Sequence, residues 1–285
     1  QSGGAATTGD IQEINSQLEH MEQQNIKQTE RKCAVTFIDD DGRIETWNLL
    51  KPIFESKNSV CCTAISSGLV GNLDYMTKEQ ITTLYNEGWE ICNHTKTHAN
   101  LSEKTESEVR EELTHCINFI QQNGWGDGKI LVYPYGGFNE TSLRVTRELC
   151  TGAFSVIQEI NDDIIRQFAI TRISITTQYG NGDFTLQQLK DFVDEAYVKG
   201  RYLVFTIHSW YETFKPSELS ELIDYIKSKN IEIITASEGV KRFGNVLDTG
   251  VYNSNNKIIS NTGFETGYNI IATSTTHNSN SPIYN

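Results

Sequence analysis

Short apolar runs alternate with amphipathic stretches along the central part of the chain. The runs that predict buried strands cover residues 33–38, 60–65, 89–92, 129–133, 153–157, 168–175, 202–207 and 231–235. After the capping-box sequence from Thr105 to Glu108, apolar residues repeat at helical spacing: Val109, Leu113, Cys116, Ile117 and Ile120. This alternation of strands and helices favours a parallel α/β barrel, with a doubly wound open sheet as the alternative.

The two ends of the chain have different patterns. Residues 1–10 are rich in Gly, Ala and Thr, and the apolar positions Ile11, Ile14, Leu18 and Met21 that follow are spaced as in a heptad repeat. The repeat predicts either a short coiled coil over 11–31 or one amphipathic helix that packs on its own domain. Beyond residue 245 the chain is rich in Asn, Ser, Thr and Gly and has short β-prone runs.

We therefore divide the chain into three parts. Residues 1–32 form a flexible lead and a coiled-coil helix, residues 33–244 a distorted (β/α) barrel of about seven strands, and residues 245–285 a β-prone linker or the start of a further module. The chain opens QSGGAATTGD, which lacks the features of a signal peptide. Because its first residue is not Met, we expect a fragment or a processed product.

Charge and hydropathy exclude several classes of partner. The chain has 24 Lys and Arg against 37 Asp and Glu, which gives a net charge of −13 at pH 7. Nucleic acids and acidic membrane surfaces need a basic face, so neither is expected as a partner. A mean hydropathy of −0.43 and the lack of long apolar runs predict no membrane span.

The six cysteines form no CxxC pair, and two of them, Cys61 and Cys62, are adjacent. This spacing suits neither a zinc cluster nor a disulfide scaffold. We expect free, buried thiols and folding in a reducing cytosol.

Candidate metal ligands follow two of the predicted strands. Asp39, Asp40 and Asp41 come directly after the run 33–38, and carboxylates held so close repel one another unless a cation or a shared proton compensates. His94 and His98 follow the run 89–92, and a helical turn would bring two histidines four residues apart to one ion.

A further histidine, His208, directly follows the buried run 202–207. The carboxyl ends of barrel strands surround one site, so we expect these three segments to meet there. Two histidines and one carboxylate leave coordination positions open for water and substrate, as catalysis by a metal requires.

Taken together, these segments resemble the polysaccharide deacetylase family, the NodB-homology carbohydrate esterases. Residues 88–98, GWEICNHTKTH, are similar to the second motif of that family, and residues 38–42, IDDDG, to its first motif, TFDDG. Residues 133–136, YPYG, resemble its third motif, RxPYG, and residues 207–208 its fifth. The four motifs occur in the order that the family has.

The resemblance implies a distorted (β/α) barrel that removes acetyl groups from N- or O-acetylated sugars with the help of a divalent metal ion. Carried over residue by residue, it implies three metal ligands, a general base, a general acid and a backbone N–H for the oxyanion: Asp41, His94 and His98; Asp40; His208; and Tyr135. Zn²⁺ is the expected ion, and Co²⁺, Ni²⁺ and Mn²⁺ also suit this ligand set.

The chain departs from the family pattern at three places. Asp39 stands where the family has an aromatic residue, so a register with Asp39 as base and Asp40 as ligand stays open. Val132 replaces the arginine of the third motif, and Arg172 is our candidate for the missing charge. No fourth motif, Asp-x-x-Asp-Trp, is visible, so the acetyl pocket is left to other residues, for which Trp210, Tyr135 and Ile207 are candidates.

The sequence thus predicts a metal-dependent deacetylase whose partner is an acetylated polysaccharide. The alternative is a catalytically inactive glycan-binding or structural module of a virion or cell-surface assembly. A serine esterase is disfavoured because no GxSxG sequence occurs. A short coiled coil ahead of an enzyme domain resembles bacteriophage tail appendages, so we expect a homotrimer through 11–31 in a virion, with an extracellular or cell-surface enzyme as the alternative.

Overall fold

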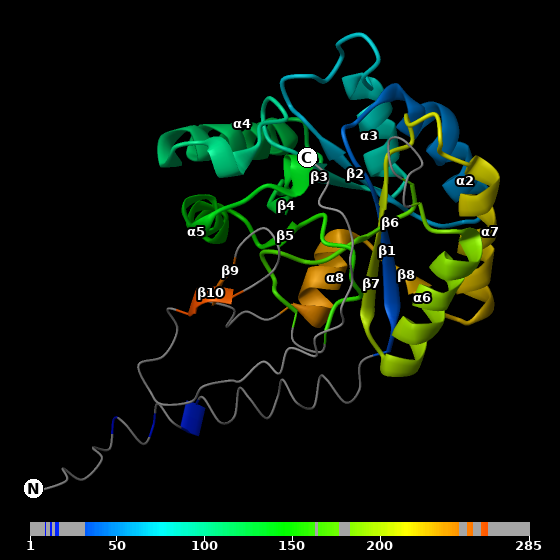
Figure 1. Ribbon diagram of the computed structural model, residues 1–285. Coiled ribbons are helices and arrows are strands. Elements are labelled where there is room, and N and C mark those ends of the chain that lie inside the picture. The colour runs from blue at the N-terminus through cyan, green and yellow to red at the C-terminus, as the bar shows by residue number, and fades with distance from the viewer. Residues whose placement is uncertain are drawn as a thin grey trace, which may run out of the picture.

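The central feature of the computed structural model is a parallel sheet of eight strands (Figure 1). The structure describes residues 32–162, 165–176, 183–244, 250–252 and 258–261, together with residues 9, 12, 15 and 16. The strands are β1 (Ala34–Asp39), β2 (Cys62–Ile65), β3 (Glu90–Asn93), β4 (Ile130–Val132), β5 (Gly152–Phe154), β6 (Ile173–Ser174), β7 (Tyr202–Ile207) and β8 (Glu232–Ile233). Their order is β5-β4-β3-β2-β1-β7-β6, and β8 pairs with the first residues of β1.

The segment ahead of β6 joins the two edges of this sheet. Ile170 forms a parallel bridge with Phe154 of β5, and the N–H of Ser155 donates to the carbonyl of Ile170 at 2.8 Å. Three residues later the same segment pairs with β7. The sheet therefore closes into a distorted α/β barrel, which confirms the predicted fold class. The expected strand 168–175 is shorter than predicted, because only Ile173–Ser174 pair continuously.

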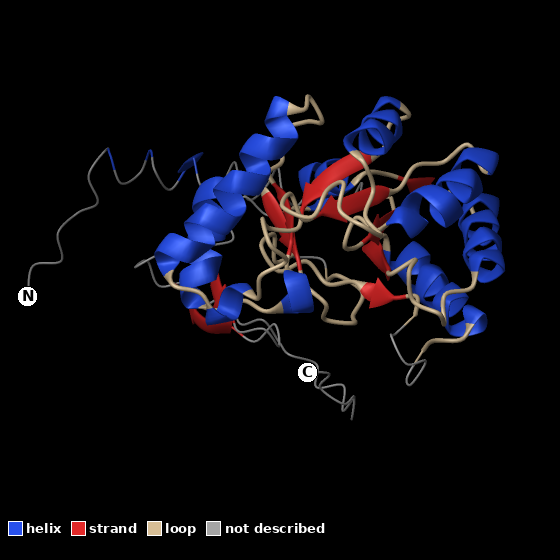
Figure 2. Cartoon of the chain, turned by 90° about the horizontal axis from the view of Figure 1, so that it is seen from above, coloured by secondary structure: helices blue, strands red, loops and turns tan. Residues whose placement is uncertain are grey.

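Helices surround the sheet (Figures 1 and 2). They are α2 (Lys51–Ser56), α3 (Lys78–Asn86), α4 (Glu106–Gln122), α5 (Glu140–Leu149), α6 (Leu186–Lys199), α7 (Pro216–Ser228) and α8 (Ala236–Phe243), with short helical turns η1 (Thr46–Leu50), η2 (Leu101–Glu103) and η3 (Pro134–Gly136). The predicted capping box at Thr105 is present at the start of α4, and capping boxes also begin α3, α5 and α6. None of the described helices is both long and apolar enough to cross a membrane.

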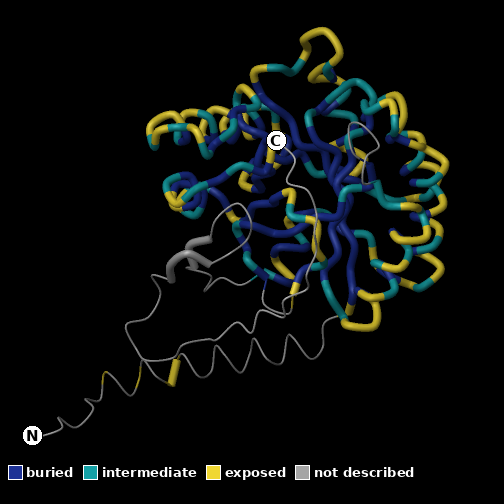
Figure 3. Tube along the Cα trace, in the orientation of Figure 1, coloured by how far each residue is buried: buried dark blue, intermediate teal, exposed yellow. Residues whose placement is uncertain are grey.

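The side chains of β1 alternate between two parts of the core. Val35 and Phe37 belong to the larger cluster, which packs under α6 and α7, whereas Ala34 and Ile38 belong to the cluster with Cys62 and other inward residues of neighbouring strands. The strands form the buried centre of the molecule (Figure 3). Because successive side chains of a strand point to opposite faces, this alternation also determines to which side Asp39 and Asp40 point.

All six cysteines are free and buried, as predicted. At the carboxyl end of the chain, β9 (Gly250–Tyr252) and β10 (Ile258–Asn261) pair antiparallel, in keeping with the β-prone pattern there. The rest of 245–285 and nearly all of the heptad segment 11–31 lie outside the described residues.

Candidate active site

Asp41, His94 and His98 converge at the carboxyl ends of β1 and β3. Oδ1 of Asp41 is 3.3 Å from Nε2 of His94 and 3.0 Å from Nε2 of His98. The ligand atoms of all three residues lie within 4.8 Å of one another. Asp41 has a φ of 80° and Gly42 a φ of 65°, so the chain turns sharply after β1 and directs the Asp41 carboxylate across to β3.

The loop that carries the two histidines takes no helical turn, so that expectation is wrong. Thr95 and His98 instead adopt positive φ angles of 66° and 61°. The side chain of Asn93 accepts the N–H of Thr95 at 2.8 Å. A carboxylate oxygen of Glu112, on α4, accepts the N–H groups of Lys96 and Thr97 at 2.9 and 2.8 Å. Asn93 and Glu112, which the sequence did not single out, thus hold the turn that brings His98 next to His94.

The donor set at this point fits a divalent cation. Nδ1 of His94 donates to the carbonyl of Val132 at 2.8 Å, which leaves Nε2 to face the Asp41 carboxylate. An unprotonated Nε2 and a carboxylate oxygen are both acceptors, so a proton or a cation has to lie between them. Burial alone would raise the pKa of Asp41, but hydrogen bonds from His94 and His98 outweigh it and hold that pKa well below its usual value. An ionised carboxylate and two imidazoles, of which His94 is oriented through its second ring nitrogen, make a suitable ligand set for a metal ion.

Asp40 points into the mouth of the barrel and is paired with Arg172. Nη1 and Nη2 of Arg172 donate to Oδ1 and Oδ2 of Asp40 at 2.8 and 2.9 Å, and Nε donates to the carbonyl of Ser155 at 2.7 Å. The side chain of Arg172 has 0% exposure. Burial would raise the pKa of Asp40, but the charge and the hydrogen bonds of Arg172 lower it below its usual value.

Asp39 points to the other side of β1, away from Asp40. Its carboxylate accepts the hydroxyl of Thr46 at 2.6 Å and both the N–H and the hydroxyl of Ser209, at 2.9 and 2.8 Å. Burial raises the pKa of Asp39 to about 7, against the opposing effect of these hydrogen bonds. Asp39 therefore joins the end of β1 to η1 and to the residues after β7, and it contacts neither histidine of the ligand set.

His208 follows β7 and faces Asp40, with Nε2 at 3.9 Å from Oδ2 of Asp40. Its ring stacks on Tyr211 with 4.5 Å between centroids and an interplanar angle of 2°. Nδ1 is buried and has no partner among the described residues. Burial lowers the pKa of His208, although the charges of Asp40 and Asp41 act in the opposite direction. The side chain keeps 19% exposure, so it is open to a substrate at the barrel mouth.

Tyr135 lies in η3 directly after Pro134, and its φ of 57° turns the backbone at this point. Its ring packs edge-on against His98 with 4.7 Å between centroids, while its side chain is 69% exposed. Within the described part of the chain, no hydrogen bond occupies the Tyr135 N–H. A free N–H beside a candidate metal ligand is suited to an oxygen that develops negative charge.

Two other features of the molecule are separate from this site. Cys62, Glu90 and Cys92 come close together in the barrel. Cys62 accepts the N–H of Ala236, Glu90 accepts the N–H of Ser237, and the two thiols pack among apolar residues.

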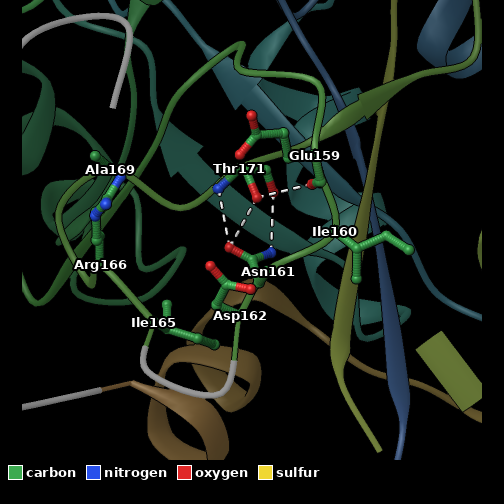
Figure 4. Close-up of a pocket in the computed structure, with 8 residues that line it drawn as sticks. All are labelled: Glu159, Ile160, Asn161, Asp162, Ile165, Arg166, Ala169 and Thr171. Carbon is green, nitrogen blue, oxygen red and sulfur yellow. Dashed lines mark hydrogen bonds between the residues drawn. The ribbon is translucent and has the colours of Figure 1, made fainter. Parts of the chain in front are cut away.

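The pocket in Figure 4 is lined by residues 159–162, 165, 166, 169 and 171, none of which belongs to the site. Its central side chain, Asn161, is satisfied by hydrogen bonds to Thr171 and Tyr202.

Comparison with protein families places this geometry in context. Residues 25–151 match the family model of polysaccharide deacetylases. A putative polysaccharide deacetylase of Bacillus subtilis, YxkH, is 23% identical over 125 residues, which are 44% of this chain and 44% of that protein. The chain thus aligns with less than half the length of this curated relative. The matched segment includes all residues of the site up to Tyr135 and excludes Arg172 and His208.

Solved structures of similar fold extend the match to most of the barrel. The Xyl-CE4 domain of a multidomain xylanase from the hindgut metagenome of Trinervitermes trinervoides has a TM-score of 0.56 at 17% identity, over 80% of this chain and 100% of that one. The peptidoglycan deacetylase PdaC of B. subtilis has a TM-score of 0.54 at 15% identity, over 75% and 92%. An acetyl xylan esterase of family 4 from Clostridium thermocellum, in complex with cobalt, has a TM-score of 0.54 at 16% identity, over 74% and 91%.

At these identities the structures establish the fold alone, and the family model establishes the segment that carries the deacetylase motifs. The resemblance to the polysaccharide deacetylase family is thereby confirmed, with residues 25–151 matching its model and the barrel having the fold of family 4 carbohydrate esterases.

Proposed function

We propose that this protein removes acetyl groups from an acetylated polysaccharide by metal-dependent hydrolysis. The observation that carries the proposal is the convergence of Asp41, His94 and His98 on one point, with Oδ1 of Asp41 within 3.3 Å of both Nε2 atoms. The charge-paired carboxylate of Asp40 and the imidazole of His208 lie on the same side of the barrel. This combination suits hydrolysis of an acyl group better than it suits simple glycan binding.

The three convergent residues would hold the ion. A bound divalent ion supplies a Lewis acid for the acetyl carbonyl and makes water more acidic. Zn²⁺ is the ion that we propose first, and Co²⁺, Ni²⁺ and Mn²⁺ suit the same ligands. The family 4 esterase of C. thermocellum in complex with cobalt supports a metal site in this fold.

Asp40 is the proposed general base. Its low pKa keeps it ionised at neutral pH, so its carboxylate is ready to accept a proton from the attacking water. Arg172 supplies the positive charge that the third motif lacks at Val132, and it holds both oxygens of Asp40 in place. The base keeps its orientation because its cationic partner is itself fixed by the carbonyl of Ser155.

His208 is the proposed general acid, and the N–H of Tyr135 the proposed oxyanion donor. Nε2 of His208 faces the space beside Asp40, so it can deliver a proton to the leaving amine or alkoxide. A fixed backbone donor on the oxyanion is typically worth about 3–4 kcal/mol. The exposed ring of Tyr135 lies at the entrance, where a sugar would approach.

The register with Asp39 as base and Asp40 as ligand has less support. Asp39 already accepts three hydrogen bonds, one from Thr46 and two from Ser209. Both partners lie on the side of β1 that faces away from Asp40. Asp40 contacts Arg172 rather than the two histidines. We therefore retain Asp41 as ligand and Asp40 as base.

The alternative is an inactive glycan-binding or structural module of a virion or cell-surface assembly. The missing third-motif arginine and Asp39 in place of an aromatic residue favour this alternative slightly. The Arg172–Asp40 pair weakens the first of these two arguments. A place on a phage tail, a trimer through 11–31 and an extracellular enzyme are proposals that rest on the sequence pattern alone.

The test combines metal content with acetyl release. We expect about one divalent ion per chain, release of acetate from acetylated glycan fragments and from a chromogenic acetyl ester, and loss of both activities on chelation. His98→Ala should lose the ion and the activity. His115→Ala is the matched control: His115 lies on α4 and contacts the hydroxyl of Ser67 rather than the ligand set, so this variant should retain both the ion and the activity. A metal-free wild-type protein, or acetyl release that chelators leave unchanged, would contradict the proposal.

A further inference from the structure

The three aspartates at the end of β1, Asp39 to Asp41, contact the three residues after β7, His208 to Trp210. Asp39 accepts from Ser209, and Asp40 faces His208, whereas the third aspartate, Asp41, accepts a hydrogen bond from Trp210. Nε1 of Trp210 donates to Oδ2 of Asp41 at 2.7 Å. This bond engages the one oxygen of Asp41 that does not face the histidines.

The indole of Trp210 is itself held in place. The guanidinium of Arg43 lies 5.1 Å from the centroid of the Trp210 ring, and it lies 4.8 Å from the ring of Tyr75. Tyr211 packs edge-on against Trp210 with 4.6 Å between centroids. The preceding residue, Ser209, is fixed by both its N–H and its hydroxyl. The donor therefore meets Asp41 in one orientation.

A carboxylate at a turn can rotate about its last side-chain bond unless both oxygens are engaged. Nε1–H of an indole is a donor only, so it cannot compete with Oδ1 for a cation. We propose that Trp210 is a positioning residue: its N–H holds Oδ2 of Asp41 so that Oδ1 stays directed at His94 and His98. The inference rests on the proposed metal-dependent function and assigns to Trp210 a role in metal affinity.

Other metal sites indicate how much metal affinity the loss of the Trp210 N–H should cost. Removal of a residue that orients a metal ligand typically costs about 10–100-fold in metal affinity. Trp210→Phe keeps an aromatic ring for Arg43 and Tyr211 and removes the N–H. We expect it to weaken Zn²⁺ and Co²⁺ binding by about tenfold or more.

The experiment is calorimetric titration of Zn²⁺ and Co²⁺ into metal-free wild type, Trp210→Phe and Trp125→Phe. Trp125 is a matched control because its indole N–H also donates, to Thr82 at 2.9 Å, at a place remote from the ligand set. We expect Trp125→Phe to bind metal as the wild type does. Equal affinity in all three proteins would overturn the role of Trp210 and leave the proposed function intact, whereas a wild type without metal binding would overturn both.

A second measurement does not require a stable Trp210 variant. The chain has four tryptophans, so protein labelled with ¹⁵N at Trp has four indole N–H signals, and single replacements of the other three assign Trp210 by elimination. We expect the Trp210 signal to shift on addition of Zn²⁺ more than the other three. A Trp210 signal that does not respond while metal binds would overturn the inference.

Discussion

Arg172 and Asp40 are 132 residues apart in the sequence, and two parallel hydrogen bonds of 2.8 and 2.9 Å join them in the barrel. A guanidinium matches a carboxylate in this geometry better than an ammonium does. The residue just before β6, Arg172, thus supplies the charge that the family pattern places at position 132, where this chain has Val132. The site keeps its charge balance although one motif residue has been replaced.

Replacement of Arg172 should affect both stability and catalysis. Arg172→Met leaves a buried carboxylate without a partner, which typically costs about 3–5 kcal/mol of unfolding free energy. Urea unfolding measures this loss. The double variant Arg172→Met with Asp40→Asn removes both charges, so we expect it to be more stable than Arg172→Met alone. If the double variant is the less stable of the two, the pair is not the source of the loss.

The base and the ligand can be told apart by paired substitutions. Asp40→Asn should lower turnover by about 10²–10⁴-fold because it removes the proton acceptor. Metal affinity should stay near that of wild type, since Asp40 contacts Arg172 rather than the ligand set. Asp41→Asn should lose affinity and turnover together. The assignments are reversed if calorimetry finds the larger loss of affinity in Asp40→Asn.

His208 should matter most where the leaving group needs a proton. His208→Ala should slow hydrolysis of amides and alkyl esters strongly and of aryl esters with acidic leaving groups only weakly. Rates on a graded series of acetyl esters test this, with Tyr211→Phe as a control that keeps the ring stacked on His208. A uniform loss along the series would remove His208 from the role of acid.

Asp39 should make stability depend on pH. Its pKa is about 7 in the folded protein against an ordinary value of 3.8, so the folded state retains a proton that the unfolded state releases. The resulting stabilisation is complete below pH about 4 and is lost as the pH rises through about 7, with a slope of about 1.4 kcal/mol per pH unit between these values.

Asp39→Asn should lack this slope. Urea unfolding of both proteins at several pH values gives the difference in unfolding free energy, in which the opposite contribution of His208 cancels. The advantage of the wild type over Asp39→Asn should therefore shrink between pH 4 and pH 7. Parallel curves would mean that Asp39 is ionised throughout this range.

Assembly through residues 11–31 is a prediction from the heptad pattern. Isoleucine at both kinds of seam position favours more than two strands, so we expect a trimer. Light scattering on the full-length protein at micromolar concentration measures the mass of the assembly. A monomer would reduce the pattern to a single amphipathic helix.

The barrel and the strand-end site could be predicted because they follow from periodicity. The strand 202–207 was predicted with its observed bounds, and the histidines and aspartates lie at strand ends where parallel barrels keep their chemistry. The direction of the Asp39 side chain also follows from strand periodicity. Successive side chains of a strand point to opposite faces, so Asp39 points away from the face that carries Ala34 and Ile38.

The contacts that hold the site could not be predicted in this way. The Trp210–Asp41 bond joins residues 169 apart, and the turn at His98 depends on Glu112 of a later helix. No spacing within one segment signals such a contact. Arg172 was a reasonable candidate only because the family pattern left a charge to be supplied.

The pairing of β1 with β7 also determines when the site exists during folding. Asp39 is in register with Ile207, so the first strand of the barrel completes its pairing only with one of the last. Contacts of such long sequence separation form slowly, because loop closure must precede them. Residues 33–200 can therefore gain much of their helical structure and still lack His208, the proposed acid, and the N–H of Trp210 can reach Asp41 only after β7 docks. Under the proposed function, we therefore expect acetyl release to begin only after β7 has paired with β1, so that a nascent chain would stay inactive until β7 has left the ribosome.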